Sequence, residues 1–160
     1  HKLHEKGIDL VAGREESILK QVRVRDVMRE KFHTVLPSES FESLATFFFT
    51  SKVDYLYLTG ERGDLAGVVS LTDLRPYLKE ESLWPLVCAR DVATLDPVAV
   101  MPSENLLDAL NKFAYRNVAQ LPVVSDPHTR RLIGVVRRSD LLEGYQKIVL
   151  DKHVNPPDEG

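Results

Sequence analysis

The chain reads LAGVVSLTDL at residues 65–74 and LIGVVRRSDL at residues 132–141. Each stretch begins with apolar residues around one glycine and continues into a polar segment that closes on Asp-Leu. The apolar part is typical of a buried strand, and the polar residues after it are typical of the start of a helix. A complete strand-to-helix transition therefore occurs twice in this chain.

The similarity between the two copies extends upstream of these stretches. Two further pairs of segments match, VRDVM (24–28) with ARDVA (89–93) and LPSES (36–40) with MPSEN (101–105). These earlier pairs lie 65 residues apart, whereas the closing pair lies 67 residues apart. We therefore expect two extra residues of the second copy in the polar turn at 126–129. A repeat of this length is a whole small domain and not one turn of a solenoid.

The spacing of the apolar residues predicts the same element order in both copies, strand–helix–strand–strand–helix. The elements are expected at 33–36, 40–51, 55–59, 65–70 and 71–81 in the first copy, and at 97–101, 105–116, 120–125, 131–137 and 139–150 in the second. Because the strand at 65–70 is apolar, we expect it to be buried on both faces. The predicted fold class is α/β (α+β), with two tandem β-α-β-β-α repeats packed with pseudo-two-fold symmetry.

The repeat also sets the predicted domain boundaries. Residues 24–82 form the first repeat, 83–88 a connector and 89–150 the second repeat, with an N-terminal linker or helix at 1–23 and a polar tail at 151–160. A short helix is expected at 13–21, and Trp84 of the connector is expected to pack against the core. Because the chain begins at His1 and runs directly into charged, helix-like sequence, we interpret it as a piece of a longer protein.

Composition excludes several classes of function. A chain of 160 residues with 43% hydrophobic content suits one compact unit or two closely paired halves. A net charge of −3 lacks the basic footprint of a nucleic-acid binder, so no nucleic-acid partner is predicted. The single cysteine, Cys88, excludes an internal disulfide and favours a reducing compartment. The histidine spacing and the absence of a nucleophile–base signature predict neither a metal site nor catalysis by this chain.

Several of these segments together resemble the CBS-domain pair, also called the Bateman module. The matching stretches are Gly67 to Leu74, Gly134 to Leu141, the Asp-Val-Met at 26–28 and the Leu-Pro-Val-Val at 121–124. The resemblance covers roughly residues 22–145 and implies a regulatory module that is not itself an enzyme. It also implies a homodimer formed through helical faces and a cleft between the repeats that binds an adenine nucleotide (ATP, ADP or AMP). S-adenosylmethionine and an empty cleft both stay open as alternatives.

A narrower resemblance concerns the N-terminal lead. The segment KGIDLVAGREESILKQVRVRDVM (6–28) is similar to the stretch that joins the last membrane helix of bacterial CLC chloride channels and transporters to their cytoplasmic CBS pair. This resemblance implies a partner domain embedded in the membrane and a location at the cytoplasmic face of that membrane. The alternatives are a nucleotide-sensing CBS module of another protein, soluble or a transporter, and a structural dimerisation unit without a ligand.

The resemblance implies two related nucleotide clefts, each with one terminal Asp that binds the ribose hydroxyls. The first candidate set is Thr34, Val53, Asp54, Tyr55, Arg137, Ser139 and Asp140. Arg137 departs from the usual Ser or Thr of the family, although its guanidinium could hold a phosphate. Val53 stands where an aromatic ring could stack on the base, and Asp54 adds negative charge near an anionic ligand. The alternative for Ser139 and Asp140 is helix capping.

The second candidate set is Ser70, Thr72, Asp73, Val98, Ala99, Val118 and Ala119. Its Ser-Leu-Thr-Asp segment is the full hydroxyl–acid pattern that the family uses with nucleotides. The alternative is a capping box, in which Ser70 is the N-cap and Asp73 lies three residues on. The arginine pairs 130–131 and 137–138 have two interpretations as well, as solvated charges around a hairpin or as ligands of a phosphate.

Overall fold

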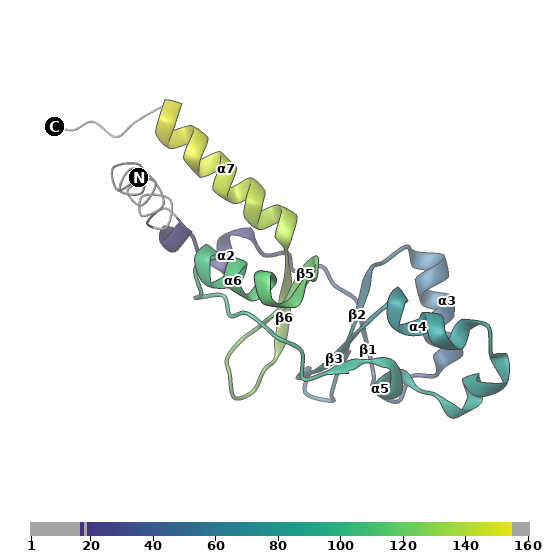
Figure 1. Cartoon of the computed structure of the whole chain (residues 1–160). Coiled ribbons are helices and arrows are strands. Elements are labelled where there is room, and N and C mark those ends of the chain that lie inside the picture. The colour runs from purple at the N-terminus through teal and green to yellow at the C-terminus, as the bar shows by residue number, and fades with distance from the viewer. Residues whose placement is uncertain (1–16, 18, 155–160) are drawn as a thin grey trace, which may run out of the picture. The chain divides into compact units, whose positions relative to one another are not determined.

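The computed structural model describes residues 17 and 19–154 and places two β-α-β-β-α repeats in chain order (Figure 1). The first repeat consists of β1 (Thr34–Val35), α3 (Phe41–Ser51), β2 (Tyr55–Thr59), β3 (Leu65–Ser70) and α4 (Leu71–Leu78). The second consists of α6 (Leu106–Arg116), β5 (Gln120–Val124), β6 (Leu132–Arg137) and α7 (Arg138–Val154), with a single parallel bridge at Val100 in the place of β1. The short strand β4 (Thr94–Leu95) lies in the segment that leads into this repeat. The short helices α2 (Val24–Val27), η1 (Glu81–Leu86) and α5 (Ala89–Val92) precede or join them. The mixed α/β fold predicted from the sequence is thereby confirmed.

The chain forms two compact units whose limits differ from those of the repeats. Unit 1 contains the described residues up to 29 together with 100–123 and 135–154, and unit 2 contains 30–99 and 124–134. Each unit thus combines most of one repeat with the leading segment of the other, which is 24–29 in the first repeat and 89–99 in the second. The predicted helix at 13–21 lies outside the described residues except for 17 and 19–21, which are helical.

Matching hydrogen bonds hold the leading segments in place. In unit 2, the backbone N–H of Ala89 donates to the carbonyl of Glu39 at 2.8 Å, so α5 of the second repeat lies against the start of α3. In unit 1, the N–H of Val24 donates to the carbonyl of Glu104 at 2.8 Å, so α2 of the first repeat lies against the start of α6. The two repeats therefore exchange their leading segments at equivalent positions.

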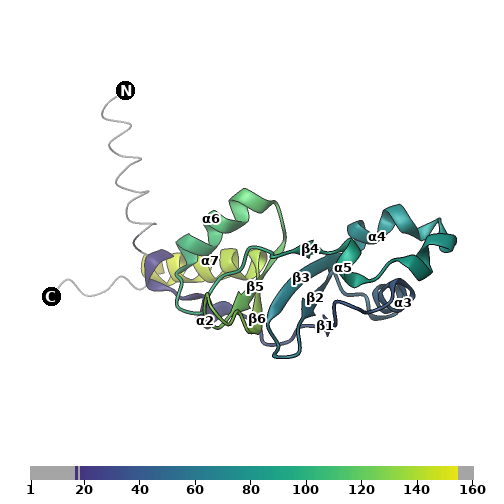
Figure 2. The same ribbon diagram turned by 90° about the horizontal axis from the view of Figure 1, so that it is seen from below.

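A four-stranded sheet forms the centre of unit 2, in the order β1-β2-β3-β4. β1 is parallel to β2, and the remaining neighbours are antiparallel, with Tyr55 opposite Ser70 and Val68 opposite Thr94. Helices α3 and α4 pack on one face of this sheet (Figure 2). Their contact with the sheet is apolar and buried; its members include Phe41, Leu44, Phe48, Leu56, Leu58, Val69 and Leu74.

Helix α6 gives unit 1 its core, because its apolar residues recur at helical spacing. The buried positions are Leu106, Ala109 and Phe113. Helix α7 contacts both α6 and α2, and β5 pairs with β6. Leu141 of α7 and Val24 of α2 are fully buried. None of the described helices is both long and apolar enough to cross a membrane.

Most predicted elements agree with the structure, and so does the expected packing of Trp84. Trp84 packs on Phe41 with ring centroids 5.1 Å apart and donates its indole N–H to the carbonyl of Tyr77 at 2.8 Å. The two extra residues of the second repeat lie in the connection between β5 and β6, as predicted for 126–129, because the 65-residue offset holds as far as β5 and becomes 67 at β6.

Two expectations are wrong. The strand predicted at 97–101 is reduced to a single parallel bridge between Val100 and Val123, which is the equivalent of β1 on β2. The short strand β4 lies earlier and pairs antiparallel with β3 of the first repeat. Asp96 has a left-handed backbone with φ 49°, and Pro97 has no N–H to donate, so the strand ends at Leu95. β3 is fully buried on only one face, because its burial alternates along the strand. The other face carries Ala66, Val68 and Ser70, which are half-buried.

The two hairpin connections meet within unit 2. Asp64 and Arg131 form an antiparallel bridge, flanked by bonds from the N–H of Leu65 to the carbonyl of Arg130 (2.8 Å) and from the N–H of Leu132 to the carbonyl of Gly63 (3.0 Å). With the 67-residue offset, each of these pairs joins equivalent segments of the two repeats. The bridge is therefore locally two-fold symmetric.

Candidate functional site

The junction of β3 and α4 carries the first group of predicted site residues. Asp73 accepts hydrogen bonds from the backbone N–H of Ser70 at 2.8 Å and from its hydroxyl at 3.1 Å. Ser70 is the residue before the first turn of α4, so these bonds satisfy one of the free N–H groups at the helix start. The predicted capping interaction between Ser70 and Asp73 is present. Both bonds end on Oδ2, and in the described part of the chain Oδ1 has no hydrogen-bond partner.

The equivalent junction of β6 and α7 is organised differently. Arg29 donates from Nε to Oδ2 of Asp140 at 2.8 Å and from Nη2 to Oδ1 at 3.0 Å. The side chain of Asp140 is only 13% exposed, whereas that of Arg29 is 51% exposed. The hydrogen bond from Arg29 holds the pKa of Asp140 below its ordinary value; burial opposes this shift, and the charge of Arg137 adds to it. Both carboxylate oxygens at this junction are thus already engaged.

Arg29 owes its position to the exchanged leading segment. Its backbone N–H donates to the carbonyl of Val135 at 2.8 Å, and the N–H of Val135 donates back to Arg29 at the same distance. This bridge is the equivalent of Thr94 opposite Val68 on β3. Arg29 was missed by the analysis of the sequence. The 65-residue offset aligns it with Thr94, but only the exchange of leading segments brings it to Asp140.

The remaining residues of the first set lie on several elements. Thr34 is exposed on β1 and stands opposite Tyr57 in the register. Tyr55 begins β2 directly opposite Ser70, which brings together one residue from each predicted set. Asp54 is exposed in the short loop before β2, whereas Val53 packs against the core of unit 2. Val53 is thus engaged in structural packing.

Other predicted residues flank the second junction. Arg137 ends β6, Ser139 lies in the first turn of α7, and both are exposed. The carbonyl of Ala119 accepts from the N–H of Arg138 at 2.9 Å, so this residue of the second set lies beside the start of α7. Val118 is half-buried just before it, and Val98 and Ala99 are half-buried between β4 and Val100.

Metal coordination finds no support in these groups. Within residues 17 and 19–154, no cluster of three or more His, Cys, Asp or Glu side chains is placed to hold a metal ion. The chemistry that the two junctions offer is therefore hydrogen bonding by carboxylates, hydroxyls and helix N–H groups. Such groups suit a ligand that carries hydroxyls and phosphate.

Comparison with known proteins identifies the family. The sequence pattern of the CBS domain matches residues 24–80 and again residues 89–147. The chain belongs to the CBS domain family. The tandem arrangement makes it a CBS pair, and both matched segments begin at the exchanged helices α2 and α5.

Solved CBS structures show the same fold. The CBS-pair protein CBSX2 from Arabidopsis thaliana is 27% identical and aligns with a TM-score of 0.70 over 81% of this chain and 97% of that protein. A structure of CBSX2 in complex with AMP is also 27% identical, with a TM-score of 0.67 over 80% of this chain and 98% of that one.

Curated relatives of this CBS pair include enzymes. Homoserine O-acetyltransferase of Methanococcoides burtonii is 27% identical over 127 residues, which are 78% of this chain and 24% of the relative. Inosine-5'-monophosphate dehydrogenase of Halobacterium salinarum is 24% identical over 115 residues, which are 72% of this chain and 22% of the relative. The chain thus spans about a quarter of the length of the curated relatives it matches. These comparisons show the CBS pair, but not the chloride-channel context.

Proposed function

We propose that this CBS pair is a regulatory module of a larger protein and that it binds an adenine nucleotide at the β3–α4 junction. The observation that carries the proposal is the free Oδ1 of Asp73 beside an exposed Thr72, in a chain of the same family and fold as an AMP-bound CBS pair. A carboxylate oxygen accepts hydrogen bonds from the vicinal hydroxyls of a ribose. The hydroxyl of Thr72 at the start of α4 suits a phosphate group, whereas the hydroxyl of Ser70 already donates to Asp73.

The choice between the two predicted sites rests on the state of the two carboxylates. At Asp73 one oxygen is available, and capping by the other oxygen holds the carboxylate in place. At Asp140 a ribose would have to displace a bidentate guanidinium. The ribose hydroxyls would compete there with two charge-assisted hydrogen bonds that are already formed. The Asp73 site, with Ser70 and Thr72 at the start of α4, is therefore proposed first, and the Asp140 site second.

Regulation is proposed to act through the parent protein. Nucleotide binding can change the activity of an attached domain only by the difference in affinity between its two states, commonly about 1–3 kcal/mol. The enzymes among the curated relatives favour a parent outside the channels, in which this module senses the nucleotide and another part performs the chemistry. We propose homodimerisation through helical faces; Phe49 of α3 and Tyr115 of α6 are large exposed rings, at 63% and 89% exposure.

A chloride channel or transporter is the second candidate for the parent protein. The observation in its favour is the similarity of residues 6–28 to the lead of CLC cytoplasmic domains. In that case the module lies at the cytoplasmic face of the membrane. Sequencing the gene upstream of the codon for His1 decides between the candidates, because an apolar helix of about 20 residues there indicates a membrane parent.

Calorimetric titration with AMP, ADP, ATP and S-adenosylmethionine tests the proposed site. We expect wild-type binding and at least an approximately tenfold loss in Asp73→Asn, since one charge-assisted hydrogen bond is worth about 1.4 kcal/mol or more. Asp91→Asn is the matched control, because it weakens a similar cap, from the N–H of Cys88 at 2.9 Å, without touching the site. Equal binding by both variants would place the ligand elsewhere. If none of the four ligands gives a heat of binding, the proposed nucleotide site is refuted, and the alternative of a structural dimerisation unit is favoured.

A further inference from the structure

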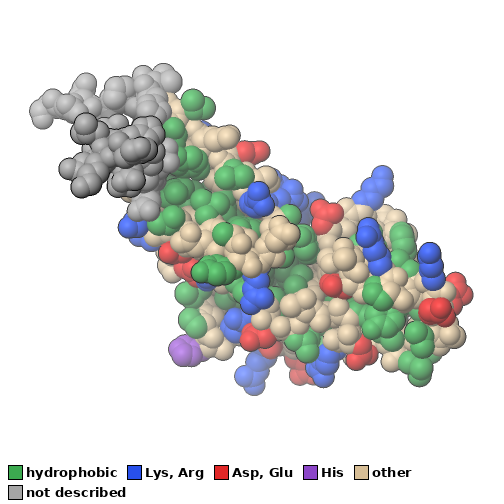
Figure 3. All heavy atoms as spheres, viewed as in Figure 1, with side chains coloured by type: hydrophobic (Ala, Val, Ile, Leu, Met, Phe, Trp, Pro, Cys, Tyr) green, Lys and Arg blue, Asp and Glu red, His purple; other side chains and the backbone are tan. Residues whose placement is uncertain are grey.

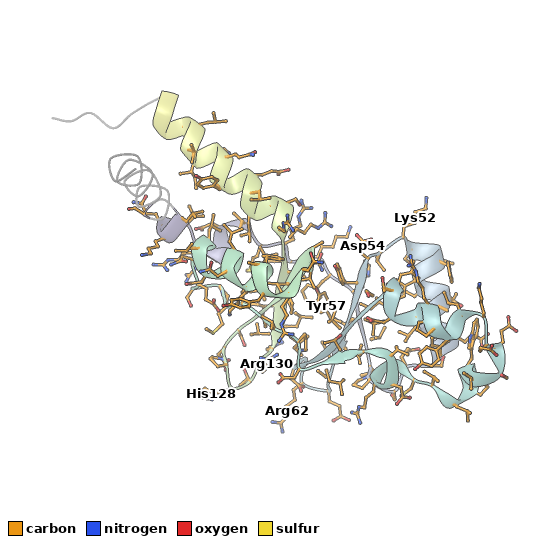
Figure 4. All side chains as sticks on the ribbon, viewed as in Figure 1. Lys52, Asp54, Tyr57, Arg62, His128 and Arg130 are labelled. Carbon is orange, nitrogen blue, oxygen red and sulfur yellow. The ribbon has the colours of Figure 1, made fainter. Side chains whose placement is uncertain are left out.

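A surface hollow of about 700 Å³ lies between the two hairpin connections of unit 2. Its walls are formed by Arg62, Asp64, Ser125, His128, Thr129 and Arg131. Figure 4 shows Arg62 and His128 on the tips of the two hairpins at one end of the unit. Figure 3 shows basic side chains, interspersed with acidic ones, along the same edge. The volume is in the range of small-molecule sites.

The pairing of the hairpins places Arg131 at this hollow, and its guanidinium forms no ion pair with the opposite residue, Asp64. Asp64 and Arg131 are directly opposite in a bridge whose flanking hydrogen bonds run outside the pair, so their side chains share one face. The carboxylate of Asp64 nevertheless turns toward Gly60. The side chain of Arg131 passes beside Gly63, and a Cβ added to that glycine would lie 3.8 Å from it. In the described part of the chain, the two side chains form no ion pair.

A second acidic group at the hairpins, Asp126, accepts hydrogen bonds from its own turn. Asp126 accepts from the backbone N–H groups of His128 (2.9 Å) and Thr129 (2.7 Å), and also from the hydroxyls of Ser125 and Thr129. These bonds, led by the Thr129 hydroxyl, lower the pKa of Asp126 to about 2. The Asp126 carboxylate is therefore committed to shaping the turn and is not available as a partner for the arginines.

Arg130, the residue before Arg131, does not line the hollow. It has a left-handed backbone, φ 48°, at the position where the first repeat has Gly63, φ 75°. Its guanidinium donates to the carbonyl of Pro97 at 3.0 Å and lies 3.4 Å from Asp96. Arg130 is thus bonded to the segment before Val98, whereas Arg131 lines the hollow. Within the described chain, the side chains of Arg62 and Arg131 have no hydrogen-bond or ion-pair partner.

We propose that this hollow binds the phosphate group of a small phosphate monoester, held by the guanidinium groups of Arg62 and Arg131. Planar guanidinium groups match phosphate oxygens bidentately, and two of them on separate hairpins can contact one phosphate from two sides. The site is separate from the nucleotide site, because β3 begins beside the hollow and ends at Ser70. Six residues of strand place the two about 17 Å apart. The ligand would therefore tie the two hairpins together independently of the nucleotide.

The test is an NMR titration of the full chain with inorganic phosphate and with ribose 5-phosphate, at constant ionic strength set with chloride. We expect saturable shifts of the backbone amides at 61–64 and 126–131. Arg62→Gln and Arg131→Gln should each weaken binding at least about tenfold, in line with the loss of one charge-assisted contact. Arg75→Gln on α4 is the matched control and should bind like the wild type. Arg62→Lys, which keeps the charge without the planar fork, should bind with intermediate affinity.

The outcomes separate this site from the nucleotide site. Asp73→Asn should leave phosphate binding unchanged, and adenosine, which has no phosphate, should leave the hairpin amides unshifted. Phosphate binding that is weakened in the two arginine variants but unchanged in Asp73→Asn supports the hairpin site, even if no nucleotide binds at Asp73. No saturable shift up to high millimolar phosphate, or shifts that persist in the double variant Arg62→Gln/Arg131→Gln, would overturn the proposal. Arg62 lies exposed at a hairpin tip, so Arg62→Gln alone keeps the test valid if the double variant fails to fold.

Discussion

Arg29 holds both carboxylate oxygens of Asp140, at 2.8 and 3.0 Å, whereas the equivalent pair in the other repeat is Thr94 and Asp73. Asp73 therefore turns back on Ser70 and keeps one oxygen free, while Asp140 is taken up by a residue from the exchanged leading segment. Two related sequence motifs thus hold their carboxylates in different hydrogen bonds, because of one residue far away in the sequence.

Removing this guanidinium should release Asp140. In Arg29→Gln, we expect the pKa of Asp140 to rise toward its ordinary value, because the hydrogen bond that lowers it most is gone. Carboxyl-selective NMR titration of the wild type and the variant measures the change. Arg75→Gln should leave the Asp140 titration unchanged. If the pKa of Asp140 stays low in Arg29→Gln, the pair seen here does not control this carboxylate.

The second prediction is that the β5–β6 turn loses stability in acid. The folded pKa of Asp126 is lowered from 3.8 to about 2, so its contribution is fully present above 3.8 and is lost as the pH falls toward 2. The difference in melting temperature between wild type and Asp126→Asn should therefore be largest near neutral pH and shrink below about pH 4. Asp151→Asn, an exposed position on α7, should follow the wild-type curve. A constant difference down to about pH 2 would contradict the prediction.

Lys52 is a position where glycine should be better. It ends α3 with a left-handed backbone, φ 50°, a conformation that costs a side-chain-bearing residue about 1 kcal/mol. Lys52→Gly should stabilise the protein by about that amount in urea denaturation. Lys79 at the end of α4 has φ −89°, so Lys79→Gly should be neutral or destabilising. Stabilisation by both substitutions would point to the loss of lysine charge as the cause.

Gly67 is required by the close approach of β4 to β3. A Cβ on Gly67 would lie 3.1 Å from the carbonyl oxygen of Thr94 and 3.3 Å from the Cβ of Ala93. Gly67→Ala should therefore destabilise the fold by about 1–3 kcal/mol. The comparison is Gly144→Ala in α7, where the new methyl meets only the Cγ1 of Val27, at 3.2 Å, and alanine gains helix propensity. Equal losses in urea denaturation would refute the argument from backbone contact.

Local patterns predicted most of the secondary structure. The apolar spacing around Phe41, Leu44 and Phe48 placed α3 correctly, and the apolar run of β3 gave its bounds. The position of the two extra residues between β5 and β6 was predicted from the change in the offset between the repeats, from 65 to 67 residues. Each of these features depends on neighbours in the sequence, which is why the sequence alone reveals them.

The features that escaped prediction depend on contacts between distant segments. β4 forms where it pairs with β3, and the left-handed Asp96 ends it before the predicted strand. The pairing of Arg29 with Asp140 spans 111 residues and follows from the exchange of leading segments. The capping of Ser70 by Asp73 is a local interaction, and it was one of the two interpretations that the sequence offered. Whether Asp73 also binds a ribose depends on groups that the local sequence does not specify.

The bridge between Asp64 and Arg131 gives the module the character of a dimer within one chain. It joins equivalent positions, as an isologous interface between identical subunits would, and the exchanged helices α2 and α5 resemble arms swapped between two partners. In a true homodimer, a change on one side of such an interface appears on the other side as well. Covalent fusion removes that constraint. Arg130 can therefore stand opposite Leu65 while its equivalent in the first repeat is Gly63. In the same way, Asp73 keeps one carboxylate oxygen without a hydrogen bond while both oxygens of Asp140 are bonded to Arg29.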